Sequence, residues 1–154
     1  MVQEKSSKPN FHAHLQPLLE NGEYDKALAY LNRLGHENDF IRNAKGVCLM
    51  RLGETDAALQ VLRELAFAGQ ICIPSSTPPL YKANYATALL LKGYNQEALE
   101  ILSSLDPKAH PYIAAMKETF AEWKKGLGLF GRILCGIRLY PRKPVALKYP
   151  PGAL

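Results

Sequence analysis

The sequence predicts an all-α protein built from repeated helical hairpins, and two observations support that prediction. First, the pattern G-x4-A-L-x2-L-x2-L occurs three times, beginning at Gly22, Gly53 and Gly93. Second, the Ala and Leu positions within each copy recur at intervals of three or four, so they share one face of a helix. Three copies in register indicate a repeat protein, because one hairpin cannot bury its own apolar faces and needs a stacked neighbour.

A second apolar stripe precedes each copy and predicts the first helix of each hairpin. The stripes are Leu15, Leu18 and Leu19; Gly46, Leu49 and Met50; and Ala86, Leu89 and Leu90. The glycine between two stripes ends the first helix, since glycine adopts a left-handed backbone at low cost. In the second helix of each hairpin, the first apolar residue is small and lets the paired helices approach closely. These residues are Ala27, Ala58 and Ala98. We therefore expect hairpins over residues 11–34, 40–65 and 80–105.

The positions of the prolines and the spacing of the apolar residues predict the conformation of the segments around the hairpins. Residues 69–79 contain three prolines and two serines, so we expect a surface loop there, or alternatively a loop that makes a contact or carries a phosphorylation site. A helix is predicted over residues 111–125, because proline is tolerated at a helix start. A further amphipathic helix over residues 127–139 is expected to pack along the last hairpin as a cap. Residues 140–154 contain four prolines and should be extended.

This arrangement resembles the tetratricopeptide repeat family over roughly residues 10–123. The family's small residue in the first helix is matched by Gly46 and Ala86, and its turn is matched best by Gly22-Glu23-Tyr24. The resemblance implies a short right-handed α-solenoid of three hairpins with C-terminal capping helices. It divides the chain into a flexible N-terminus (1–9), a repeat domain with its closing helix (10–125), and a basic apolar helix with a proline-rich tail (126–154).

The resemblance also implies a function in protein–protein interaction, as an adaptor, scaffold or chaperone-like protein. The three-repeat chaperones of bacterial type III secretion are similar in length, although they would be expected to be acidic. The family's concave groove maps onto the first helices of the hairpins. The groove residues implied are His12, Gln16, Asn43, Val47, Met50, Arg51, Asn84, Thr87 and Leu91. The cationic pair of the family's carboxylate clamp is absent, so no clamp is expected.

The residue types on this face agree with a peptide ligand. Asn43, Val47 and Met50 are separated by four and three residues and therefore share a helix face. Side-chain amides can satisfy the N–H and C=O groups of a bound backbone, and methionine adapts to varied side chains. We predict that an extended or helical peptide from a partner protein binds there. The alternative is that the apolar members fill the core between neighbouring helices.

The charge distribution supports an alternative function. Residues 1–115 hold 11 Lys/Arg and 12 Asp/Glu, whereas residues 116–154 hold 8 and 2, and no acid follows Glu122. The basic apolar segment could therefore anchor the chain peripherally on an anionic membrane. Specific nucleic-acid binding is not expected, because net charge alone supports only non-specific contact. The polar start, the absence of a spanning segment and three scattered cysteines favour the cytoplasm, with reduced thiols.

No pattern in the sequence predicts catalysis, a cofactor or a metal site. Residues 126–131 match G-x-G-x-x-G, but a helix rather than a strand precedes them, so a dinucleotide site is rejected. His12 and His14 point apart on a helix, and no further ligand is near them in sequence. We expect a protein that is not an enzyme.

Overall fold

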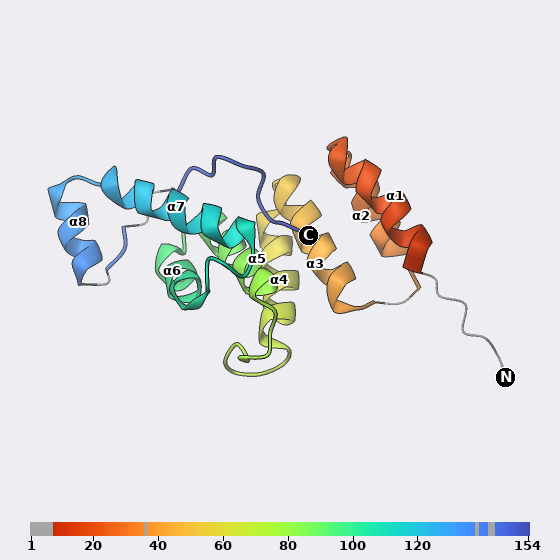
Figure 1. Cartoon of the computed structure of the whole chain (residues 1–154), viewed down its shortest axis with the longest axis horizontal. Helices are drawn as coiled ribbons and strands as arrows, with labels where there is room; N and C mark the ends of the chain where they lie inside the picture. The colour runs from red at the N-terminus through yellow and green to blue at the C-terminus, as the bar shows by residue number, and fades with distance from the viewer. Residues whose placement is uncertain (1–7, 36, 138, 142–143) are drawn as a thin grey trace.

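The computed structural model describes residues 8–35, 37–137, 139–141 and 144–154, with the side chains of residues 8–12 excepted. Within these residues there are eight helices and no strand, which confirms the predicted all-α class (Figure 1). The helices are α1 (Lys8–Glu20), α2 (Tyr24–Arg33), α3 (Asp39–Arg51), α4 (Thr55–Phe67), α5 (Pro79–Leu91), α6 (Asn95–Ser104), α7 (Pro111–Lys125) and α8 (Leu129–Gly136).

The three turn glycines end α1, α3 and α5, as predicted. Gly22, Gly53 and Gly93 have φ angles of +73°, +80° and +79°, the left-handed region in which a side chain is costly. In the second turn, the Gly53 N–H donates to Met50 O at 3.1 Å and the next N–H, of Glu54, donates to Leu49 O at 2.9 Å. These two bonds satisfy carbonyls that the end of α3 would otherwise leave unpaired, so the motif fixes where each hairpin bends.

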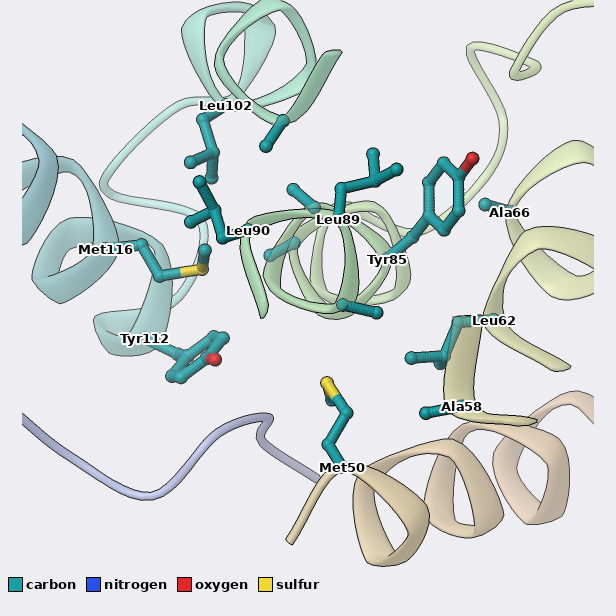
Figure 2. Packing of buried hydrophobic residues seen from close by; sticks show 14 of the residues in the cluster. Met50, Ala58, Leu62, Ala66, Tyr85, Leu89, Leu90, Leu102, Tyr112 and Met116 are labelled. Carbon is teal, nitrogen blue, oxygen red and sulfur yellow. The ribbon is translucent and has the colours of Figure 1, made fainter. Parts of the chain in front are cut away.

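Small residues allow the helices of each hairpin to pack closely. Ala27, Ala58 and Ala98 are all fully buried, as the spacing predicts. Gly46 of α3 lies against Leu62 of α4, so that a Cβ added at Gly46 would be 2.5 Å from Leu62 Cγ. Figure 2 shows the resulting core around α5, with Leu62 and Ala66 of α4 on one side and Met116 of α7 on the other.

Residues 68–78 connect α4 to α5 without helix, which confirms the predicted loop. The loop is anchored where Thr77 Oγ1 donates to Ala66 O at 3.0 Å, and Thr77 is buried. Ile71, by contrast, is 96% exposed at the other end of the loop. The bond therefore holds the α5 end of the loop against the last turn of α4, while Ile71 lies in solvent.

Helix α7 has the predicted bounds and closes the core through the buried side chains of Ile113, Met116 and Phe120. The expectation that the following helix packs along the last hairpin is wrong. α8 is shorter than expected, touches α7 but no other helix, and buries none of its eight residues. In Figure 1 it lies at the far end of the molecule from α1.

The segment after α8 runs back along the molecule instead of leaving it. Its described residues, 139–141 and 144–154, contain no helix or strand, in agreement with the extended conformation expected there. Asn95 Nδ2 donates to Pro141 O at 2.7 Å, and Lys148 Nζ lies 2.5 Å from Glu122 Oε2. The chain then passes α7 and reaches α3, where Figure 1 marks its C-terminus. Among the residues described, no helix is long and apolar enough to cross a membrane.

Candidate peptide-binding groove

The last six residues lie in a groove formed by α3, α5 and α7. We call Tyr149–Leu154 the tail segment. The groove residues that bond to it are Asn43 and Arg51 of α3, Asn84 of α5 and Tyr112 of α7. Figure 2 shows the tail ribbon passing Tyr112 toward Met50. Within each helix the groove residues are spaced three or four positions apart, so their side chains lie on one face of that helix.

Six hydrogen bonds join the described groove residues to the backbone of the tail segment. Asn84 Nδ2 donates to Ala153 O at 2.8 Å, and the Ala153 N–H donates to Asn84 Oδ1 at 3.0 Å. The side-chain amide thus pairs with both polar backbone groups of one residue, as a neighbouring strand would. Asn43 Nδ2 also donates to Ala153 O, at 3.3 Å, and its Oδ1 accepts from Asn84 Nδ2 at 2.8 Å. The two amides are almost fully buried, and this network satisfies them.

Arg51 holds the preceding two carbonyls of the tail segment. Its Nε donates to Pro151 O at 3.2 Å and an NH2 nitrogen donates to Gly152 O at 2.9 Å. The guanidinium also lies 5.1 Å from the centre of the Tyr24 ring, a cation–π distance. A planar donor fork held on an aromatic face is preorganised to bind two successive backbone oxygens.

Tyr112 provides the acceptor for the one remaining N–H of this stretch. The Gly152 N–H donates to the Tyr112 hydroxyl oxygen at 2.7 Å, and that oxygen lies 2.8 Å from Thr87 Oγ1. Since Thr87 donates to Ala83 O within its own helix, the Tyr112 O–H is free to donate to Thr87. Burial is the main cause that raises the pKa of Tyr112 to about 12. The hydroxyl therefore remains protonated at neutral pH and works as both acceptor and donor.

Gly152 is the tail residue whose identity the groove restricts most. Its φ is +80°, and an added Cβ would lie 2.6 Å from Met50 Cε and 2.9 Å from Val47 Cγ2. A side chain at this position would be strained and would also collide with the floor of the groove. Val47 and Met50 thus form an apolar floor on which only a glycine fits.

Five of the nine residues predicted for the groove lie against the tail segment. These are Asn43, Val47, Met50, Arg51 and Asn84. Thr87 is fully buried and reaches the tail segment only through the Tyr112 hydroxyl, 2.8 Å away. Gln16 lies farther along, where it bonds to Glu20 at 2.9 Å and helps to line a hollow of about 480 Å³ next to Leu154. Leu91 is 39% exposed at the end of α5. The prediction for His12 is not assessed, because its side chain is not among those that the structure describes.

The sequence analysis missed the tail segment and Tyr112. Nothing local in residues 149–154 says where they pack, because their partners lie 40 to 110 positions away in the chain. The usable signal was the glycine after two prolines, which permits an extended approach followed by a left-handed residue. Tyr112 owes its place to the start of α7, where His110 Nδ1 accepts from the Tyr112 N–H at 3.1 Å and caps the helix.

Fold and groove together define an all-helical protein of successive hairpins that holds an extended segment against three of its helices. In the comparisons with known proteins, no family model, no curated protein and no solved structure matches this chain. Among the described residues, no group of three or more His, Cys, Asp or Glu gathers as metal ligands would. The function is therefore argued from the groove itself.

Proposed function

We propose that the protein is a protein–protein interaction module of the tetratricopeptide type, a short solenoid whose groove binds an extended peptide of a partner. The observation that supports this most is the tail segment, which lies in the groove in the way that a bound peptide would. Asn84, Arg51 and Tyr112 form five hydrogen bonds with its backbone, three as donors and two as acceptors. Backbone-directed bonds of this kind are how extended peptides are held in other recognition sites.

The groove also has room beyond the tail segment. The hollow of about 480 Å³ next to Leu154 lies between α1 and α3, and both apolar and polar side chains line it. Leu15, Leu19 and Phe40 give it an apolar wall, while Gln16, Glu20 and Arg51 give it polar groups. An apolar surface with a few polar groups is typical of a ligand site. A partner peptide could therefore reach farther toward α1 than the tail segment does.

The test is selection of peptides from an unbiased display library, with two arginine variants as a matched pair. In Arg51→Ala the two bonds to backbone carbonyls are lost, whereas Arg63→Ala removes an arginine that lies over the Phe67 ring outside the groove. We expect selected peptides to bind Arg51→Ala about tenfold or more weakly, since bonds from a charged donor contribute about 1.5–3 kcal/mol. Binding to Arg63→Ala should equal binding to the parent. Peptides that bind Arg51→Ala as tightly as the parent would exclude the groove as their site.

A second candidate function, peripheral attachment to an anionic membrane, is favoured by the orientation of α8. Leu129, Phe130 and Ile133 share one face of α8 and are 77%, 74% and 56% exposed. Gly131 and Cys135 occupy the opposite face, and a Cβ added at Gly131 would be 3.1 Å from Leu127 Cβ. Gly131, Leu134 and Cys135 are partly buried, whereas three larger apolar side chains on the other face, Leu129, Phe130 and Ile133, lie in solvent. A surface helix that packs by its apolar face would bury these three.

Basic side chains flank this exposed face. Lys125 and Arg132 are exposed and have no carboxylate partner among the described residues. An apolar helix face with a basic fringe matches the interface of an anionic bilayer, where the apolar side chains enter and the cations meet the headgroups. A surface of this kind would hold the protein on the membrane while the groove stays accessible.

Vesicle binding tests this candidate, read from the emission of Trp123, the only tryptophan. We expect a blue shift with phosphatidylserine-containing vesicles that salt reverses, and none with phosphatidylcholine alone. Phe130→Ser with Ile133→Ser should lower partitioning by about tenfold or more, because burying such a side chain contributes roughly 1.5–3 kcal/mol. Ile71→Ser, a change at an exposed apolar residue far from α8, is the control. Concentration-dependent dimerisation lost in the α8 variant, without vesicle binding, would assign the face to a second copy instead.

A further inference from the structure

The groove already contains a ligand, which is part of the same chain. The backbone of residues 151–153 uses five of its polar groups in bonds to Arg51, Asn84 and Tyr112, and Ala153 O accepts a further bond from Asn43. None of these bonds involves a side chain of the tail segment. The same donors and acceptors would therefore serve any separate peptide with this backbone conformation.

The chemistry of the tail segment defines which peptides would fit. Gly152 is required by its φ of +80° and by the contact with Met50 and Val47. The two residues before it, Pro150 and Pro151, lack an N–H, so no unpaired donor is left facing the groove. Proline also fixes the extended conformation in advance, which lowers the entropy lost on binding. Upstream, the Tyr149 ring packs edge-on against Tyr112 at 5.5 Å between ring centres.

The tail segment is held in a way that permits its release. It lies outside every helix, and the three cysteines are free. Pro150 and Leu154 are exposed, and Pro151 and Ala153 are only partly buried. Each bond between neutral groups contributes only about 0.5–1.5 kcal/mol net and each bond from the charged Arg51 about 1.5–3 kcal/mol, because water replaces them on release. A competing peptide that makes the same bonds could therefore exchange with the tail segment.

We propose that Tyr149–Leu154 is a built-in competitor for the groove, and that the partner peptide is an extended segment of the form aromatic-Pro-Pro-Gly-small. This inference rests on the proposed function and adds the class of ligand and its control. A tethered segment acts at an effective concentration of about 1 mM when its linker is short and flexible. The tail segment thus excludes weak ligands and admits those that bind more tightly than it does.

The experiment uses the full-length chain and a labelled hexapeptide, acetyl-Tyr-Pro-Pro-Gly-Ala-Leu, as the probe in trans. Gly152→Val places a Cβ against Met50 and should expel the tail segment. Gly69→Val is the matched control, since Gly69 has a φ of +76° but no described atom within 4 Å of its added Cβ. We expect Gly152→Val to bind the probe about tenfold or more tightly than the parent, because competition from the tethered segment is removed. The control should bind as the parent does.

A second variant covers the case that Gly152→Val does not fold. Ala153→Pro removes the N–H that donates to Asn84 and adds no side chain to the groove floor, so it should also release the tail segment. Thermal melts establish that each variant is folded before binding is measured. A probe in which valine replaces the glycine should not bind any of the proteins.

The outcomes separate this inference from the proposed function. Equal probe affinity for the parent and both tail variants would overturn the inference. If library peptides bind at Arg51 but the hexapeptide does not, the inference about ligand class is wrong while the proposed function stands. If no library peptide binds even the tail-released variants, the proposed function itself is wrong and the tail segment is a fixed part of the fold.

Discussion

At the scale of single residues, the contact between Gly46 and Leu62 sets how closely α3 and α4 approach. We expect Gly46→Ala to destabilise the protein by about 1–3 kcal/mol, the usual cost of overpacking a close contact. The added Cβ would lie 2.5 Å from Leu62 Cγ, a branch point that cannot move aside without shifting the whole side chain. Alanine is otherwise the better helix former by about 1 kcal/mol, so a destabilising result isolates the steric term. Urea unfolding measures it.

Gly136→Ala is the control for that prediction. Gly136 is also helical, but no described atom lies within 4 Å of its added Cβ. The same substitution there should be neutral or slightly stabilising. If both substitutions stabilise the protein, the close approach of α3 and α4 at Gly46 would be disproved.

Residue by residue, the sequence predicted positions better than it predicted environments. The spacing of Asn43 and Val47 placed both on one face of α3, because helical period depends only on local sequence. Their environment was not predictable, since the amides of Asn43 and Asn84 are buried by a segment that arrives from the other end of the chain. A peptide-binding amide and a buried structural amide have the same local sequence pattern.

At the scale of helices, the repeated pattern was sufficient for α1 to α7 because each hairpin is stabilised by contacts between neighbours in sequence. The turn glycines and the buried alanines were predicted on that basis, and the bounds of α7 were predicted from the proline at its start. The pattern failed for α8, whose apolar spacing is equally helical. Periodicity identifies an amphipathic helix but does not say what its apolar face touches. Here Gly131, Leu134 and Cys135 are partly buried, while Leu129, Phe130 and Ile133 lie in solvent.

At the scale of the whole molecule, the tail segment brings the C-terminal end of the chain into contact with helices that lie 40 to 110 residues earlier in the sequence. It bonds to α3, α5 and α7, so its attachment depends on all three helices keeping their relative positions. Conversely, its release exposes the buried amides of Asn43 and Asn84 to water, where hydration replaces the lost bonds. Groove occupancy and the stability of the stack are therefore linked.

The protonation of two buried groups, Tyr112 and Cys48, predicts that the protein loses stability at alkaline pH. Burial raises the pKa of Tyr112 to about 12 and the pKa of the Cys48 thiol to about 11. A group whose pKa is raised by folding stabilises the protein fully below its unfolded value, about 10 for tyrosine, and this stabilisation is lost as pH rises through the folded value. For Tyr112 the loss amounts to about 2–3 kcal/mol between pH 10 and 12. Ionisation also leaves the Tyr112 oxygen, 2.8 Å from Thr87 Oγ1, able only to accept hydrogen bonds.

Urea unfolding from pH 8 to 12 distinguishes the contribution of Tyr112 from that of the other groups. Tyr112→Phe should be less stable than the parent at pH 8, because Gly152 loses its acceptor, yet its stability should fall less steeply above pH 10. Cys48→Ala should flatten the curve earlier, between about pH 9 and 11, since its thiol titrates lower. A Tyr112→Phe curve parallel to that of the parent would show that this hydroxyl does not couple protonation to folding.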